Sequence, residues 1–416
     1  MVRAQPMISG RFLQPPIVVS VEDERSILRG YLVIDSTVRG RAVGGVRMLP
    51  DVSIDEIRSL ARTMTLKYAF AGLSHGGAKA GIVGDPEQPA VGKQELLVEF
   101  FRALAPILRS GAFTPRPDMG TSNFELRQAM ETAGLKRTRR GAGFGDRSGL
   151  YTGFGVVGAA LAGLERLGIR VNQCSVAVEG FGKVGSSVAR LFVERGAKVV
   201  ALSTRQGAIY SSRGLNIPEA MRLHGEHGSG MVDRYADADR LDTRALLELD
   251  VDVLSPCARF HSIDGVNAPR IAAKIISAGA NNPVTAESEQ MLYERGKLCL
   301  PDFVTSTGGM LGEAMEYAGL SESFIKDSLV SRFRARTGEI LKQSEKRQQH
   351  IREYLEPIIL ERFHAMKAKA ENPDLATRLA GAGKALYRRG LLPKFLVRFL
   401  APYYFSDRRG DNLGIS

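Results

Sequence analysis

Two lysines and an aspartate are the residues of this sequence that are best suited to carry chemistry. Lys79 follows residues 76–78, two glycines and an alanine, whose small size lets a backbone and a substrate approach each other closely. Lys67 precedes it and Asp118 follows it along the chain. A lysine beside another cation in a partly dry cleft loses proton affinity and becomes a usable base near neutral pH, while the second lysine can hold an anion. These residues suit an enzyme that handles a small carboxylic acid.

A dinucleotide-binding pattern lies further along the chain. The short apolar run 175–179 leads directly into Gly-x-Gly-x-x-Gly, and the sequence then predicts a helix over 186–195 and a strand over 197–202. The first glycine permits the turn, the second lets a pyrophosphate approach the helix N-terminus, and the third allows the helix to pack closely on the strand. We assign this loop to a nicotinamide cofactor through Gly180, Gly182, Lys183, Val184 and Gly185.

The end of the next strand bears on the choice between NAD and NADP. An acidic residue near Thr204 would bind the adenosine ribose hydroxyls and repel a 2′-phosphate. The sequence has none there, and the adjacent Arg205 offers a partner for that phosphate. We therefore expect NADP, or both cofactors, to be used.

Composition sets the broad class of the protein. The 416 residues suffice for two domains, and 44% hydrophobic with 25% charged residues is typical of a soluble globular chain. Three cysteines without paired spacing favour a reducing, cytoplasmic setting, and no signal segment or bilayer-spanning stretch is visible. We interpret the net charge of +12 as a solvated basic surface, because no recognition motif for nucleic acid accompanies it. His224 and His227 lack further ligands at useful spacing, so no metal site is expected.

Hydrophobic periodicity predicts the elements around these motifs. Alternation over residues 17–48 indicates antiparallel strands, and helices are predicted over about 54–71 and 94–108. A further helix should begin near Ser122. The Gly- and Arg-rich stretch 137–149 has no periodicity, and we place an interdomain hinge there.

Several short motifs together resemble the Glu/Leu/Phe/Val dehydrogenase family. They keep the family's order over roughly residues 27 to 320, and they occupy residues 43–50, 64–69, 71–79, 117–121, 151–156, 279–283, 301–304 and 308–309. With the strand–turn–helix pattern, the resemblance implies an α/β protein. Its N-terminal mixed-sheet domain, for substrate and catalysis, would span residues 1–145. A Rossmann-type doubly wound domain would span 146–320, and C-terminal helices over 321–416 would pack back on the hinge.

The activity that the resemblance implies is reversible, NAD(P)-dependent oxidative deamination of an L-amino acid to a 2-oxo acid and ammonia, carried out by a homo-oligomer. Lys79 would be the general base, Asp118 would move protons to and from nitrogen, and Lys67 would bind the α-carboxylate. Thr152 and Asn281 would contact the nicotinamide end of the cofactor, and Gly45 would line the substrate site.

Three positions depart from the family's pattern. Val43 stands where glutamate dehydrogenases of the family usually have a lysine, and Glu313 stands where they have a serine, so we expect an apolar substrate of the leucine, valine or phenylalanine type rather than glutamate. Glu313 either points away and pairs with a basic group, which we favour, or selects a cationic substrate. Ser306 replaces an asparagine that helps to bind substrate.

Two further questions remain open at the level of sequence. A catalytically weak homologue that serves as a regulatory or structural subunit is the alternative to an active enzyme, and a module that only binds a dinucleotide is a third possibility. The apolar and basic segment 391–405 is interrupted by Pro393. We expect it to cover the protein's own surface or a subunit interface, in preference to an anionic membrane surface.

Overall fold

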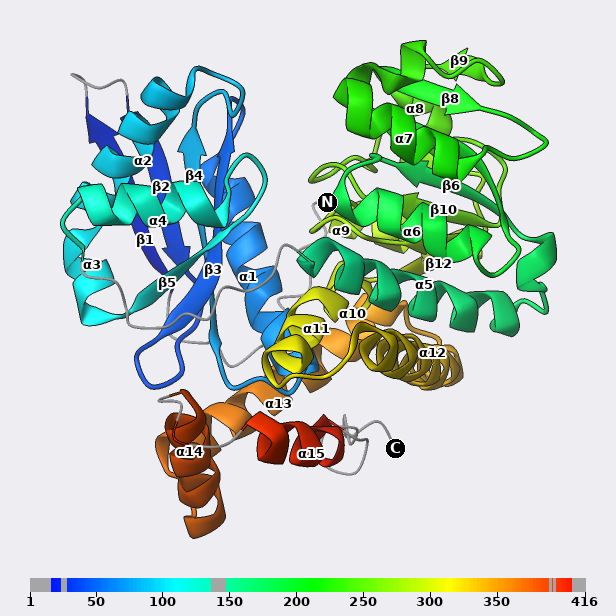
Figure 1. The fold of residues 1–416 in the computed structure, drawn as a ribbon. Coiled ribbons are helices and arrows are strands. Elements are labelled where there is room, and N and C mark those ends of the chain that lie inside the picture. Colours follow the sequence, from blue (N-terminus) through cyan, green and yellow to red (C-terminus); the bar gives the residue numbers. More distant parts are fainter. Residues whose placement is uncertain (1–15, 24–27, 136–146, 389–390, 392–393, 406–416) are drawn as a thin grey trace, which may run out of the picture. The chain divides into compact units, whose positions relative to one another are not determined.

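The computed structural model describes residues 16–23, 28–135, 147–388, 391 and 394–405 (Figure 1). The chain divides into two compact units. Unit 1 comprises Met1–Ala69, Ser74–Thr138 and Ile359–Asn372. Unit 2 comprises Phe70–Leu73, Arg139–Ile358 and Pro373–Ser416. Most of the hinge segment predicted over 137–149 lies outside the described residues.

Unit 1 is built on a five-stranded mixed sheet with the strand order β1-β2-β4-β3-β5. The pairs β1–β2 and β2–β4 are antiparallel, whereas β3 runs parallel to both β4 and β5. The prediction of antiparallel strands over 17–48 was therefore wrong for β3. A helix connects β3 to β4, and such a crossover returns the chain to the same edge of the sheet, so that the second strand runs parallel to the first. The strands are β1 (Ile17–Asp23), β2 (Leu28–Ile34), β3 (Ala42–Leu49), β4 (Gly76–Val83) and β5 (Phe113–Pro117).

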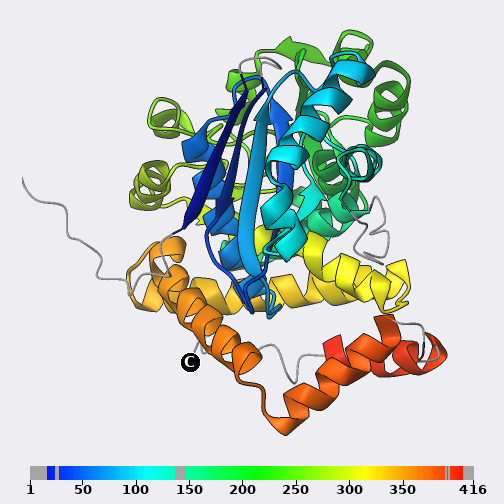
Figure 2. The ribbon, with the colours of Figure 1, turned by 90° about the vertical axis from the view of Figure 1, so that its left-hand side faces the viewer.

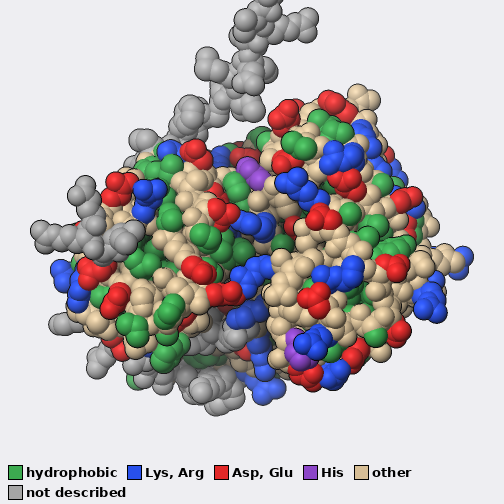
Figure 3. Space-filling view, turned by 90° about the horizontal axis from the view of Figure 1, so that it is seen from above, with side chains coloured by type: hydrophobic (Ala, Val, Ile, Leu, Met, Phe, Trp, Pro, Cys, Tyr) green, Lys and Arg blue, Asp and Glu red, His purple; other side chains and the backbone are tan. Residues whose placement is uncertain are grey.

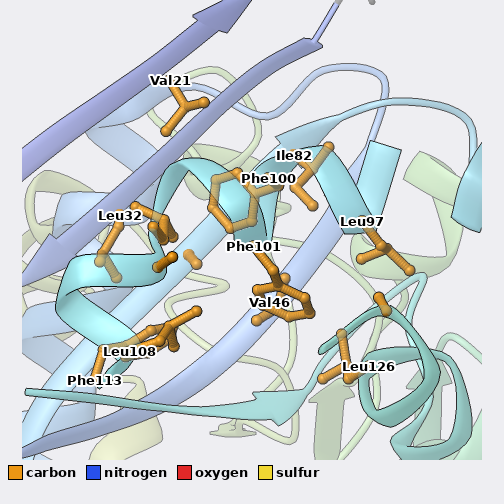
Figure 4. Close-up of a cluster of buried hydrophobic side chains, with 14 of the residues drawn as sticks. Val21, Leu32, Val46, Ile82, Leu97, Phe100, Phe101, Leu108, Phe113 and Leu126 are labelled. Carbon is orange, nitrogen blue, oxygen red and sulfur yellow. The ribbon is translucent and has the colours of Figure 1, made fainter. Parts of the chain in front are cut away.

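Helices cover both faces of this sheet (Figure 2). On one face, Ile57 and Ala61 of α1 pack with Val33 and Val52. On the other face, apolar side chains of α2, α3 and α4 meet the sheet, and Figure 4 shows Phe100 and Phe101 among them. The helices of unit 1 are α1 (Ile54–Phe70), α2 (Ala90–Ala103), α3 (Ala105–Ser110) and α4 (Asn123–Thr132).

Two local signals decide where these helices begin and end. The helix predicted over 94–108 starts earlier and is divided at Leu104, because Pro106 has no N–H to donate to the preceding turn and instead takes a position in the first turn of α3. The helix predicted near Ser122 is α4, whose N-cap is Ser122, with its side chain accepting a hydrogen bond from the backbone N–H of Glu125.

Unit 2 is built on a seven-stranded sheet with the order β12-β11-β10-β6-β7-β8-β9. Its first five strands are parallel, and β8 and β9 add antiparallel edge pairs. The predicted strand–helix–strand unit is present as β6, α6 and β7, which confirms the Rossmann-type fold. The strands are β6 (Ser175–Glu179), β7 (Lys198–Thr204), β8 (Gly207–Tyr210), β9 (Asp239–Leu241), β10 (Val253–Pro256), β11 (Ile275–Ser277) and β12 (Leu298–Leu300).

Helices surround this sheet and continue to the end of the chain. The described helices are α5 (Ser148–Arg166), α6 (Lys183–Val193), α7 (Ile217–His227), α8 (Thr243–Leu247), α9 (Ala286–Glu294), α10 (Asp302–Thr305), α11 (Gly308–Tyr317), α12 (Glu322–Lys346), α13 (Ile351–Glu371), α14 (Leu375–Arg388) and α15 (Lys394–Phe405). Short 3-10 turns occupy Val171–Gln173, Gly228–Asp233 and Ala268–Arg270.

An ion network joins three of these helices inside unit 2. Arg352 of α13 donates to Glu289 of α9 over 2.8 Å and to Asp302 of α10 over 3.1 Å. Both carboxylates are almost fully buried, with exposed fractions of 3% and 1%. A buried carboxylate needs a hydrogen-bonding cation, so Arg352 fixes α13 against α9 and α10.

The three cysteines also lie in unit 2 and form no disulfide. Cys174 is buried, and Cys257 and Cys299 are partly buried. Burial raises the pKa of the Cys174 thiol and of the Cys257 thiol to about 12 each.

The C-terminal helices are anchored within unit 2. The hydroxyl of Tyr387 on α14 donates to the carbonyl of Tyr317 on α11 over 2.8 Å, and Arg332 of α12 donates to the carbonyl of Phe405 on α15. Leu391 and Phe399 are exposed by 65% and 67%, so the part of 391–405 whose side chains are described is not fully covered by the chain itself. The described helices include none that is long and apolar enough to cross a membrane.

Candidate functional site

Lys79 lies in the middle of β4, a strand whose residues are buried from Gly76 to Ile82. Its side chain is only 2% exposed, and its Nζ lies 2.7 Å from Asp118 Oδ2. Asp118 directly follows β5. Because β3 lies between β4 and β5 in the sheet, this contact reaches across β3. Gly44 of β3 makes room for β4, since a Cβ there would lie 1.7 Å from the carbonyl oxygen of Ala78.

Arg47 completes a buried charge cluster around Asp118. Its Nε donates to Asp118 Oδ2 over 2.9 Å, and another of its nitrogens donates to Glu56 of α1. Arg47 is 3% exposed and Glu56 is 8% exposed. Neither residue was predicted from the sequence. The available signal was an arginine within an otherwise apolar strand, because charged residues are almost never fully buried unless they are paired.

This cluster lowers the proton affinities of both Lys79 and Asp118. Burial lowers the pKa of the Lys79 amine; Asp118 opposes that shift, and Arg47 reinforces it. Burial alone would raise the pKa of Asp118, but Lys79 and Arg47 together hold it well below its usual range. The site therefore contains an ionised carboxylate beside a lysine that releases its proton more readily than an exposed lysine does.

Lys67 is held in the same unit, in the last turn of α1, and is 5% exposed. A hydrogen-bonded chain fixes α1 against β4 close to it. The hydroxyls of Ser36 and Thr65 lie 2.7 Å apart, and the backbone N–H of Gly77 donates to the Ser36 hydroxyl over 2.9 Å. A Cβ on Gly77 would lie 2.3 Å from the nitrogen of Thr65, so only glycine permits this approach. The helix that carries Lys67 thus packs directly on the strand that carries Lys79.

Gly45 and Val43 border this cluster on β3. A Cβ on Gly45 would lie 2.8 Å from the Cβ of Asp118 and 3.1 Å from Lys79 Nζ, so only a residue without a side chain lets β3 approach the two groups this closely. Val43 is partly buried and pairs with Gly77 on β4 and Thr114 on β5. The structure therefore brings Gly45 into contact with the charge cluster and places Val43 two residues away on the same strand.

The glycine loop of unit 2 has the geometry of a phosphate cradle. Gly180 has φ +85°, and a Cβ on Gly185 would lie 1.8 Å from the carbonyl oxygen of Gly180. Gly182 is the N-cap of α6, and a Cβ built on it meets nothing within 4 Å. The open face of the loop at a helix N-terminus fits the pyrophosphate of a dinucleotide. Lys183 begins α6, and Val184 packs close to Gly279.

Thr204 ends β7, the strand next to the glycine loop in this sheet. Its hydroxyl donates to the carbonyl of Ser229 over 2.8 Å and accepts from the backbone N–H of Gln206 over 3.2 Å. Arg205 beside it is exposed. No carboxylate stands at either of these two positions.

The remaining predicted residues lie on three other segments of unit 2. The hydroxyl of Thr152 donates within α5 to the carbonyl of Ser148 over 2.9 Å, and Gly309 of α11 packs against that hydroxyl. Asn281 follows β11 and is partly buried. The hydroxyl of Ser306 donates to the carbonyl of Asp302 over 2.5 Å, which uses its only hydrogen. Glu313 is partly buried on α11.

Charged side chains also lie outside this cluster, in the part of the chain that the structure describes. Acidic and basic side chains are interspersed over the visible face (Figure 3). Within the part of the chain that the structure describes, no group of three or more His, Cys, Asp or Glu could hold a metal ion.

Gly45→Ala should destabilise the protein, because the added methyl group would overlap the Cβ of Asp118 and crowd Lys79 Nζ. Overpacking a buried site typically costs about 1–3 kcal/mol. The measurement is urea unfolding of the variant and of the matched control Gly84→Ala, in which the nearest atom is the flexible Leu96 side chain at 3.3 Å. Equal free energies of unfolding for the two variants would show that the cluster tolerates the methyl group.

Comparisons with known proteins agree with this geometry. Residues 13–134 match the model of the Glu/Leu/Phe/Val dehydrogenase dimerisation domain, and residues 143–369 match the Glutamate/Leucine/Phenylalanine/Valine dehydrogenase model. A glutamate dehydrogenase from Thermotoga maritima is 36% identical over 313 residues, which cover 72% of this chain and 75% of that protein. A glutamate dehydrogenase from Aeropyrum pernix is 32% identical over 321 residues, which cover 74% and 76% respectively.

The solved structures show the same fold. The hetero-hexameric glutamate dehydrogenase from Thermus thermophilus in its Leu-bound form superposes with a TM-score of 0.68 at 26% identity, covering 88% of this chain and 90% of that one. The two sequence relatives are named glutamate dehydrogenases, so a nearer likeness to the leucine, valine or phenylalanine type is not supported. The chain belongs to the Glutamate/Leucine/Phenylalanine/Valine dehydrogenase family and is an NAD(P)-dependent amino-acid dehydrogenase that acts on CH–NH2 donors.

Proposed function

We propose that the chain catalyses the reversible reaction of an L-amino acid, water and NAD(P)⁺ to a 2-oxo acid, ammonia, NAD(P)H and a proton. The observation that carries the proposal is the buried contact between Lys79 and Asp118, against which Gly45 packs closely. The proposal assigns substrate binding to a domain over 1–145, the dinucleotide to a domain over 146–320, and a C-terminal helical region to 321–416.

Each group of unit 1 has a role in this proposal. The cofactor, when bound, accepts a hydride from the α-carbon and so leaves an imine on the substrate. Lys79, whose pKa burial lowers, takes a proton from the water that attacks the imine. Asp118, ionised at neutral pH, accepts a proton from the substrate ammonium group and returns one to the departing nitrogen. Lys67 holds the α-carboxylate as its counter-ion.

Arg47 acts on this chemistry through Asp118. It donates to the same oxygen, Oδ2, that faces Lys79, and its second contact with Glu56 fixes the guanidinium on α1. A positioned carboxylate does not have to be reoriented during the reaction, which is the general advantage of a preorganised site.

In unit 2, we propose that the glycine loop, with Lys183 and Val184, binds the pyrophosphate. Thr152 and Asn281 would contact the nicotinamide end of the cofactor. The cradle at the N-terminus of α6 supports the first assignment. Thr152 lies on α5, the helix that contacts α11, and it packs against Gly309 of α11. This position supports the assignment of Thr152 to the nicotinamide end.

We also propose that the chain forms a homo-oligomer and works in a reducing, cytoplasmic setting. The match to a dimerisation domain over residues 13–134 supports the assembly. Three cysteines that form no disulfide support the setting.

A catalytically weak subunit is the rival proposal. Ser306 favours it, because its hydroxyl donates to a backbone carbonyl and cannot offer the amide N–H of the family's asparagine. The Thermus relative is itself described as hetero-hexameric. Reduced-cofactor formation by the purified chain, measured over a panel of amino acids, separates the two proposals.

Lys79→Ala should lower kcat by about 10²–10⁴-fold, the contribution of a positioned base. Circular dichroism and NADH binding should be unchanged, because the glycine loop lies in unit 2. The matched control is Lys93→Ala, which removes a partly buried lysine of unit 1 that is paired with Glu125 over 2.6 Å. Near-native turnover by the Lys79 variant would refute its role as the base.

Substrate choice tests the interpretation of Val43. We propose that the apolar side chain on β3 disfavours glutamate, although the named relatives are glutamate dehydrogenases. Val43→Lys should then raise kcat/KM for glutamate relative to leucine by at least tenfold, because it supplies a cation for a distal carboxylate. Efficient glutamate oxidation by the unmodified protein would contradict the proposal.

Glu313→Gln on the same panel shows whether Glu313 selects basic amino acids, since only then is activity on lysine and ornithine lost.

The preference for NAD or NADP tests the interpretation of Thr204 and Arg205 at the end of β7. NADP should be used at least as well as NAD, because no carboxylate occupies position 204 or 205. Thr204→Asp should shift the ratio of kcat/KM values toward NAD by repelling the 2′-phosphate. Thr204→Asn is the isosteric control and should leave the ratio close to that of the unmodified protein. Strict use of NAD by the unmodified protein would refute this assignment.

A further inference from the structure

Glu179 is a buried carboxyl group that none of the roles above uses. It is the last residue of β6, immediately before Gly180, and it is 7% exposed. β6 lies between β7 and β10 in the sheet, and the chain continues from β6 to β7 on one side before it returns to β10 on the other. That reversal of strand order is the place where doubly wound sheets bind dinucleotides. Glu179 therefore stands at the carboxyl edge over which the proposed cofactor would lie.

The segment after β10 encloses this carboxyl group. The hydroxyl of Ser262 donates to Glu179 Oε2 over 3.0 Å, and the backbone N–H of Ala258 also donates to the carboxylate. The carbonyl of Glu179 accepts from the backbone N–H of Cys257 over 2.8 Å. A Cβ on Gly180 would lie 2.8 Å from the Cβ of Ala258, so the glycine loop and this segment are in direct contact.

The charges around Glu179 only partly compensate its burial. Arg259 is the cation that lowers its pKa, and the Cys257 thiol stays protonated. Burial outweighs these effects and the two hydrogen bonds, and it raises the pKa of Glu179 to about 7. Other titratable or charged groups on the elements around β6 include His261 and Asp264 after β10, Arg244 on α8, Lys183 on α6, Arg205 after β7, and His224 against Phe181.

We propose that Glu179 takes up a proton when the dinucleotide binds, so that this one carboxyl group couples cofactor affinity to pH. The inference rests on the proposed dinucleotide site. A bound pyrophosphate brings two negative charges to the N-terminus of α6, and in a poorly solvated edge these disfavour a neighbouring carboxylate. The protonated acid can still form its hydrogen bonds, and it removes the repulsion.

The sign of the pH dependence follows from this linkage. Because the bound cofactor raises the pKa of Glu179 above its value in the free protein, Kd is constant well below pH 7, where both states are protonated. Above the pKa of Glu179 in the free protein, about 7, binding of the cofactor requires proton uptake. Over this range Kd rises by up to tenfold per pH unit. Kd becomes constant again above the pKa of the complex.

The test measures binding of NADH, whose phosphates do not titrate in this range, by fluorescence between about pH 6 and pH 9 at constant ionic strength. The wild type should bind several-fold more weakly at the alkaline end, with the change beginning near pH 7. Glu179→Gln keeps the shape and the Ser262 contact, and its Kd should be independent of pH. Ser262→Ala removes a hydrogen bond that favours the ionised form, so the curve should move to higher pH.

Calorimetry in two buffers of different ionisation enthalpy provides a second readout. Wild type should take up protons on binding NADH near pH 7.5, and Glu179→Gln should take up none. His224→Asn and His261→Asn should keep the wild-type pH dependence, which assigns the proton to the carboxyl group. A slope that persists in Glu179→Gln, or a flat wild-type curve, overturns the inference. Failure of both NADH and NADPH to bind at any pH would instead overturn the proposed function.

Discussion

The burial of a lysine amine is the constraint on which unit 1 depends. Lys79 is almost without solvent in the middle of β4, and its charged form is sustained only because Asp118 lies 2.7 Å away. Two cations, Lys79 and Arg47, contact the single carboxylate of Asp118. Glu56 contacts Arg47 and supplies the second negative charge that balances them. These four groups come from β4, the end of β5, β3 and α1, so their mutual compensation fixes the arrangement of the elements that form the site. Loss of Asp118 would leave the Lys79 amine buried without this carboxylate.

Unit 2 solves the same electrostatic problem without creating a reactive group. Arg352 lies between Glu289 and Asp302, and burial raises the pKa of Glu289 while the guanidinium stays charged. An arginine cannot release its proton at any ordinary pH, so this network can only hold helices together. In unit 1 the central cation is a lysine, which can lose its proton. The type of cation therefore distinguishes the candidate site from the structural contact.

Local signals predicted the elements that local interactions determine. The period of α1, the cap at Ser122 and the glycine loop before α6 are encoded within a few residues, and the structure agrees with all three. The direction of β3 was mispredicted, because alternation of apolar residues reports burial and not strand direction. Arg47 and Glu56 were missed, because each acquires its importance from a partner on another element. The substrate is not predictable in this way, because a pocket selects by the combined shape and charge of residues from distant segments.

The thiols of unit 2 have a consequence for redox chemistry. Only the thiolate reacts readily with oxidants or alkylating reagents. With pKa values of about 12, Cys174 and Cys257 remain protonated even in the alkaline solutions in which an exposed cysteine is mostly thiolate. Burial likewise raises the pKa of Cys299 well above its ordinary value. In the folded chain the three thiols are therefore poorly reactive, and unfolding would raise their reactivity by exposing them.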